Sequence, residues 1–132
     1  MTTLTVIENE YATIQFHMDK RIVHHTILKY VYGDNLRTPM DEGIKLLTEY
    51  GALKWLSDFH QQSAIIKEDM EWIKEDWLPR AILTKWKNWA VVLPAKTVGQ
   101  LSINRLATAF TERGITVETF TDPRAAFEWI SS

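Results

Sequence analysis

Hydrophobic and polar residues alternate along the first thirty positions of the chain, and many of the hydrophobic residues are β-branched. A period of two residues is typical of β-strands that bury one face. We expect strands over residues 4–8, 11–17 and 22–31. On the middle strand one side is hydrophobic and is expected to face the core: Ala12, Ile14, Phe16 and Met18. The chain is therefore predicted to open with an antiparallel meander.

Beyond residue 35 helical and strand patterns alternate. We expect helices over residues 36–51, 65–78, 102–114 and 123–130, and strands over residues 53–58, 88–94 and 115–120. In the first helix, Thr38 is predicted to cap the amino end, with Pro39 at the first helical position and Gly51 as the stop. Pro79 is expected to interrupt the second helix, and Asp122 to cap the last one.

This order of elements predicts an α/β fold. We expect a single mixed β-sheet, flanked by helices, in which an N-terminal antiparallel meander is followed by parallel βα units with right-handed crossovers. No repeat, linker or low-complexity segment interrupts the sequence, so residues 1–132 are predicted to form one domain.

Two of the six tryptophans lie in the charged segment EDMEWIKEDWLPRA, and the helical pattern gives them different roles. Trp77 joins a narrow hydrophobic stripe that includes Ile73, so we predict that it lies in the core. Trp72 lies about 120° round the helix, near the acidic side chain of Asp69. Its indole must then be covered by a loop or long side chain of the same chain, by a second copy, or by a ligand.

Composition narrows the class of protein. With 45% hydrophobic and 24% charged residues and a formal net charge of -2, the sequence is typical of a globular protein without affinity for nucleic acid. Cysteine is absent, which excludes disulfides and thiolate chemistry, and no segment approaches the ~20 apolar residues that span a bilayer. Residues 1–16 lack the features of a signal peptide, so we expect a cytoplasmic protein that is not an integral membrane protein.

The four histidines follow no metal-binding spacing. His24 and His25 are adjacent on a predicted strand and point to opposite faces, so they cannot share a metal ion. His17 and His60 stand apart from them, and no H-x-x-x-H or H-E-x-x-H sequence is present. We therefore predict no metal site and no cofactor, with one strand histidine half-buried and the others on the surface.

A serine–histidine–aspartate arrangement is the remaining catalytic candidate. Ser57, Asp58, His60 and Ser63 end or follow the strand at 53–58, and the carboxyl ends of parallel strands are where α/β sheets bind ligands. The segment lacks the G-x-S-x-G elbow of serine hydrolases, and the five glycines form no phosphate-binding loop. We therefore predict that the protein is not an enzyme.

The order of elements, together with LKWLSDFHQQSAIIKEDMEWIKEDWLPRA, WAVVLP and TDPRAAFEWI, resembles a group of small bacterial proteins with a STAS-like fold, relatives of the anti-sigma-factor antagonists. The resemblance covers nearly the whole chain and implies a mixed sheet with a non-catalytic role in protein contacts. In the antagonists, a serine within an Asp-Ser-Ser-Gly sequence is phosphorylated to release a partner. This chain has SDFHQQSAI there, with Ser57 and Ser63 but no glycine, which argues against such switching. The wider fold also resembles the CRAL-TRIO lipid-exchange domains.

Two functions remain open. The first is a cytoplasmic STAS-like interaction module that forms a homodimer or binds an unidentified protein, with its contact face around Trp72 and the loop 58–66. The second is a binding protein for a small apolar, lipid-like molecule, in a pocket at the carboxyl ends of the strands at 53–58 and 88–94. The residues expected at the interface or ligand surface are Trp55, Asp58, His60, Ser63, Ile65, Asp69 and Trp72.

Overall fold

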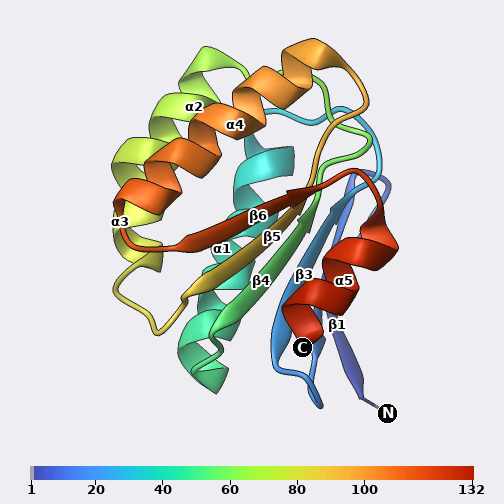
Figure 1. Ribbon diagram of the computed structural model, residues 1–132, viewed down its shortest axis with the longest axis vertical. Coiled ribbons are helices and arrows are strands. Elements are labelled where there is room, and N and C mark those ends of the chain that lie inside the picture. The colour runs from blue at the N-terminus through green and yellow to red at the C-terminus, as the bar shows by residue number, and fades with distance from the viewer. Residues whose placement is uncertain (1) are drawn as a thin grey trace.

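The computed structural model describes residues 2–132, in which six strands form one mixed β-sheet (Figure 1). The strands are β1 (Thr3–Glu8), β2 (Ala12–His17), β3 (Ile22–Ile27), β4 (Lys54–Asp58), β5 (Asn88–Val92) and β6 (Thr116–Phe120). They follow one another across the sheet in chain order. Neighbours are antiparallel from β1 to β3 and parallel from β3 to β6, which confirms the predicted α/β fold with a single mixed sheet.

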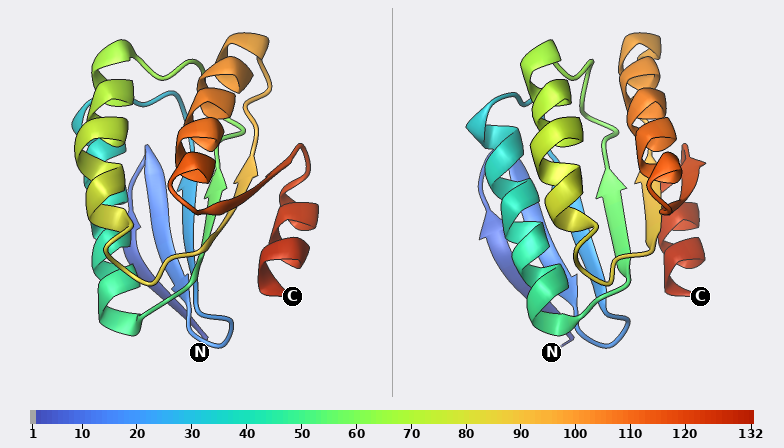
Figure 2. Two further views of the ribbon diagram at one scale, coloured as in Figure 1. Left: turned by 60° about the vertical axis from the view of Figure 1, so that its left-hand side comes forward. Right: turned by 90° about the vertical axis from the view of Figure 1, so that its left-hand side faces the viewer.

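The helices that join the parallel strands cover one face of the sheet, and the last helix covers part of the other (Figure 1, Figure 2). On the first face lie α1 (Asp34–Tyr50), the consecutive segments α2 (Lys67–Trp72), η1 (Ile73–Trp77) and α3 (Leu78–Ala81), and α4 (Thr97–Glu112). Each parallel strand is added beside the preceding one, so crossovers of one hand place these helices on one side. On the opposite face, α5 (Pro123–Ser131) covers a smaller core of six residues: Ile22, Leu56, Ala90, Val92, Ala126 and Ile130.

The predicted core side of β2 is confirmed within the strand and fails just beyond it. Ala12, Ile14 and Phe16 are buried, but Met18 is 44% exposed because β2 ends at His17 and Met18 enters the turn. β3 also ends earlier than predicted, at Ile27.

The first helix begins one turn earlier than the capping pattern predicts. Its N-cap is Gly33 rather than Thr38, and Pro39 lies inside the helix. Gly33 has a φ of 59°, which is strained for most residues but accessible to glycine. Its N–H donates to the carboxylate of Asp69 on α2, so a contact distant in sequence sets the start of α1. The predicted stop is confirmed, because Gly51 adopts the left-handed conformation.

The second helix continues through Pro79, and its irregularity lies just before that residue. Residues 73–77 form a π-helical segment, in which the N–H of Leu78 donates to the carbonyl of Ile73, five residues earlier. A proline inside a regular helix would leave one carbonyl unpaired and crowd the preceding turn. The wider turn of η1 precedes Pro79 and lets the helix continue to Ala81.

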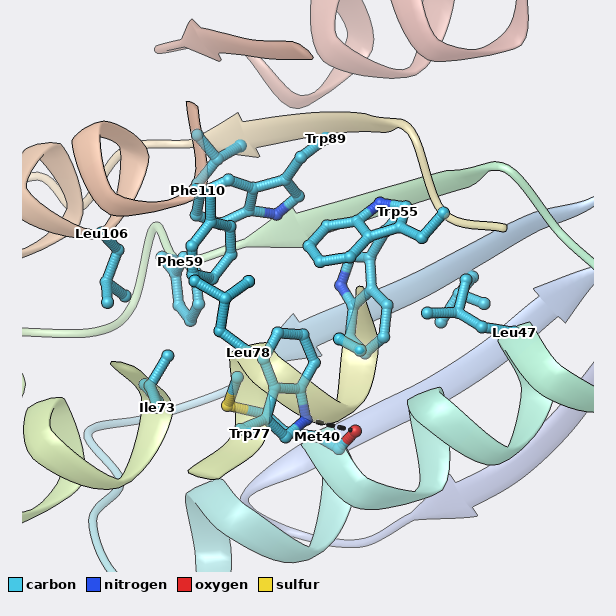
Figure 3. Close-up of a cluster of buried hydrophobic side chains, with 14 of the residues drawn as sticks. Met40, Leu47, Trp55, Phe59, Ile73, Trp77, Leu78, Trp89, Leu106 and Phe110 are labelled. Carbon is cyan, nitrogen blue, oxygen red and sulfur yellow. Dashed lines mark hydrogen bonds between the residues drawn. The ribbon is translucent and has the colours of Figure 1, made fainter. Parts of the chain in front are cut away.

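Aromatic side chains from several elements fill the larger core (Figure 3). Trp77 is 1% exposed, which confirms its predicted place, and its indole N–H donates to the Met40 carbonyl over 3.0 Å. The Trp77 ring packs edge-on against Trp55 at 5.4 Å between centroids. Gly43 on α1 lies directly over Trp55, where no side chain would fit. The core is therefore closely packed at this point.

Candidate functional site

Trp72 is half-buried and packs against the edge of the larger core, and two arginines of the same chain cover it. The guanidinium carbon of Arg37, on α1, lies 5.1 Å from the centroid of the Trp72 ring, and that of Arg80, on α3, lies 5.9 Å from it. Both distances are within the range of cation–π contacts. Of the three covers considered for Trp72, the structure contains the long side chain of the same chain, and the indole stays half-buried.

Asp69 is fully buried and therefore does not belong to an exposed contact face. Its Oδ1 accepts a hydrogen bond from Nε of Arg37 over 2.9 Å, and its Oδ2 accepts one from the N–H of Gly33 over 2.8 Å. A buried carboxylate is unfavourable unless it is paired in this way. Asp69 therefore contributes to this surface indirectly, because it fixes the position of Arg37, whose guanidinium lies over Trp72.

Arg80 is held on the other side of Trp72 by two carboxylates. One of its Nη atoms lies 2.8 Å from Asp41 and 3.0 Å from Asp76. Partial burial lowers the pKa of Arg80, but the hydrogen bonds and negative charges of Asp41 and Asp76 together raise it by more, so the side chain is always charged. Both guanidinium groups over Trp72 are therefore fixed by hydrogen bonds.

Two exposed tyrosines lie in the segment that leads into α1, directly before Gly33. Tyr30 is 43% exposed and Tyr32 is 59% exposed, and their ring centroids are 5.8 Å apart. Between them, Val31 is buried, and its N–H and C=O both bond to the side-chain amide of Gln62. Tyr32 directly precedes Gly33, which Asp69 ties to α2. We call this surface the arginine–aromatic face and define it by Tyr30, Tyr32, Arg37, Trp72 and Arg80.

Asp58 and His60 lie at an open hollow on the carboxyl edge of the sheet. The hollow has a volume of about 330 Å³ and is lined by Thr26, Ile27, Leu28, Asp58, His60, Gln61, Thr121 and Pro123. Oδ1 of Asp58 accepts the N–H of His60 over 3.0 Å, which closes a local turn. This is the edge at which the sequence predicts a ligand, but the lining is mixed rather than apolar.

The other expected residues are not in this hollow. Ser63 is half-buried in the loop before α2, and Ile65 is buried, with its N–H bonded to Ser102 on α4 over 3.1 Å. Trp55 is 1% exposed in the core, because β4 directs it toward the helices rather than toward the edge. The structure thus brings Asp58 and His60 together and separates them from Trp55 and Trp72.

An enclosed cavity of about 10 Å³ lies among the aromatic residues of the core. His25 lines it and is fully buried, and burial lowers the pKa of this histidine to about 3. Among residues 2–132, no hydrogen-bond partner reaches its Nε2 atom. Ser57, also on the cavity wall, accepts the indole N–H of Trp89 over 2.8 Å, so it stabilises the core and is not an exposed nucleophile.

A histidine pair on the α5 side of the sheet was not visible in the sequence. His24 and His25 point to opposite faces as predicted, but His24 meets His17 of the neighbouring strand. Nε2 of His17 lies 3.0 Å from Nδ1 of His24, and the Phe127 ring on α5 lies against both rings, perpendicular to His17 and tilted to His24. Only the register of β2 against β3 brings these two residues together.

Comparisons with known protein families, with curated proteins and with solved structures gave no match for the chain. None of the helices within residues 2–132 is long and apolar enough to cross a membrane.

Proposed function

We propose that the protein is a non-catalytic, cytoplasmic interaction module of the STAS-like type, and that it self-associates through the arginine–aromatic face. The observation that carries the proposal is the pair of arginines fixed over Trp72 by carboxylates, one of them the buried Asp69. Tyrosine, tryptophan and arginine are the residues that contribute most to the binding energy of protein interfaces.

The rigidity of the face supports the same proposal. Arginine normally loses much side-chain freedom when it enters an interface, and this loss weakens binding. Here Arg37 and Arg80 are already ordered by hydrogen bonds, and the Tyr32 segment is anchored through Gly33. A partner that contacts the face therefore orders few further side chains, so most of its contact energy contributes to affinity.

The apolar-ligand alternative has less support. Trp55, expected in the wall of the pocket, is packed in the core, and the cavity beside it measures about 10 Å³, about the space of one water molecule. The hollow at Asp58 and His60 is open and partly polar. No single observation favours a lipid-like molecule in either place.

The proposal is tested by measuring the mass of the native protein over a wide range of concentrations, by light scattering and native mass spectrometry. We expect a dimer for the wild type, and we expect Trp72→Ala and Tyr32→Ala to weaken dimerisation by about tenfold or more. The control is Leu101→Ala, because Leu101 on α4 is 54% exposed, much like Tyr32, but lies outside the face.

Thermal unfolding of each variant separates lost contacts from lost folding. A wild type that stays monomeric at every concentration would refute self-association. If Trp72→Ala, Tyr32→Ala and the control Leu101→Ala all weaken dimerisation equally, the interface does not lie at the arginine–aromatic face. An added mass that survives gentle desalting and disappears on denaturation would instead support the ligand alternative.

A further inference from the structure

The histidine pair on the sheet face opposite α1 has a geometry that the proposed function does not use. His17 ends β2 and His24 lies in the middle of β3, and both side chains are half-buried beside α5. Their facing ring nitrogens, Nε2 of His17 and Nδ1 of His24, are 3.0 Å apart. We propose that His17 and His24 form a binding site for a divalent transition-metal ion such as Zn²⁺.

The separation of the nitrogens fits two ligands of one ion. Zinc–nitrogen bonds are about 2.0–2.1 Å long, and a tetrahedral angle then places two ligating nitrogens roughly 3.3 Å apart. The observed 3.0 Å, which is the length of a hydrogen bond between the rings, lies within a few tenths of an ångström of this value, and an ion would require both rings to turn until their lone pairs converge on it. Both histidines are on paired strands of the sheet, so the two nitrogens are held close before any ion arrives.

His17 has a hydrogen-bond partner on the side of its ring that faces away from His24. Nδ1 of His17, the nitrogen that faces away from His24, lies 3.3 Å from the hydroxyl oxygen of Thr3 on β1. Histidines that bind metals nearly always donate their other N–H to a carboxylate, a backbone carbonyl or water, because this fixes the tautomer and the ring orientation, and a hydroxyl oxygen can serve in the same way. The Thr3 hydroxyl can accept the Nδ1–H of His17, and in that tautomer Nε2 carries the lone pair that would bind the ion.

The protonation state of the pair also suits a metal. Burial lowers the pKa of both histidines, that of His24 to about 4, so both rings are neutral at pH 7 and can offer a lone pair. The charged side chain that acts on the pair is Asp19, whose negative charge raises the pKa of His17 and would equally favour a bound cation. From α5, the pair meets the uncharged ring of Phe127.

The donor set indicates the class of ion. Neutral imidazole suits zinc, copper and nickel, whereas magnesium and calcium prefer oxygen ligands. Among residues 2–132, no group of three or more histidine, cysteine or acidic side chains converges on one point, so the protein supplies two ligands here. Water would complete the coordination and leave positions open to exchange.

The test is a titration of the full, untagged chain with Zn²⁺, followed by NMR of the histidine ring protons and by calorimetry. We expect one ion per chain, with the largest shifts at His17 and His24. His17→Gln and His24→Gln are expected to abolish this binding, and Thr3→Val to weaken it about tenfold. The control is His60→Gln, because His60 is exposed in the turn after β4, beside Asp58, and contributes no atom to the pair, so this change is expected to leave binding intact.

The result that overturns the proposal is equally specific. Zinc that shifts His60 as much as the pair, or binds His17→Gln and His24→Gln as tightly as the wild type, would mean that the two rings only hydrogen-bond to each other. Thermal unfolding shows whether each variant is folded. If the single variants unfold, the titration of the wild type tests the proposal by itself. Equimolar Zn²⁺ that leaves the ring-proton signals of His17 and His24 unchanged would show that the pair does not bind zinc.

Discussion

Replacement of Gly43 by alanine tests how tightly α1 is packed on the sheet. A β-carbon built on Gly43 would overlap Cη2 of Trp55 and lie 2.5 Å from Cζ3. Carbon atoms in contact are normally about 3.5–4.0 Å apart, so the indole would have to withdraw by roughly 1 Å or more.

Two effects of opposite sign set the size of the change. Alanine is a better helix former than glycine by about 1 kcal/mol, which favours the variant. Overpacking in a core costs about 1–3 kcal/mol and at times more. Trp55 cannot easily move, because its ring packs against those of Trp77 and Trp86, with centroids 5.4 and 5.8 Å away. The adjoining cavity measures only about 10 Å³. We therefore expect the upper end of the overpacking cost, about 3 kcal/mol, which after the gain of about 1 kcal/mol in helix propensity lowers the free energy of unfolding by about 2 kcal/mol.

Urea unfolding followed by tryptophan emission measures this difference. The midpoint is expected to fall with an unchanged slope, since the surface exposed on unfolding stays the same. Thr48→Ala, at an exposed position of the same helix, is the control and is expected to change stability by less than about 0.5 kcal/mol. Trp55→Phe is expected to cost less in the Gly43→Ala background than in the wild type. A Gly43→Ala variant as stable as the wild type would refute the reasoning.

Two further predictions follow from buried polar groups. Asp69→Ala leaves the N–H of Gly33 and the guanidinium of Arg37 without their acceptor, so we expect chemical denaturation to show a loss of about 3 kcal/mol, while the exposed Glu68→Ala stays within about 0.5 kcal/mol. Acid is expected to destabilise the protein, because burial lowers the pKa values of His24 and His25 to about 4 and 3 in the folded chain, against 6.5 for an unperturbed histidine. The unfolded chain then binds more protons below pH 6.5, and the free energy of unfolding falls by about 1.4 kcal/mol per pH unit for each histidine. Urea midpoints that stay constant between pH 6.5 and pH 5 would contradict this.

Much of the fold could be predicted from local patterns, because those patterns record which side of each element is buried. The stripe that contains Trp77 and the alternation along β2 both reflect the core directly. The start of α1 could not be predicted, because the N-cap at Gly33 depends on Asp69, 36 residues later in the sequence. A capping pattern at Thr38 and Pro39 describes only local preferences, and here a distant hydrogen bond prevails.

In the candidate site too, local patterns predict some features, and contacts between distant residues determine the others. The helical wheel separates Trp72 from the core correctly, but it cannot show that Arg37 and Arg80 come from α1 and α3 to cover the indole. The pairing of His17 with His24 depends on strand register, which no spacing within one strand reveals. The sequence places Asp69 at the expected contact surface, because sequence alone does not distinguish a solvated carboxylate from a buried one with two donors.

In the π-helical segment at residues 73–77, the number of residues, and not only their identity, determines the direction in which the side chains before it point. A π-helical turn holds one residue more than the regular turn it replaces. Deletion of one residue from this segment would restore a regular helix and rotate everything before it by about 100° relative to Trp77. Trp72 would leave its arginines and Asp69 would leave Gly33, although no residue at either position had changed. One extra residue therefore sets the orientation of the half of this helix that carries Asp69 and Trp72 relative to the half that carries Trp77.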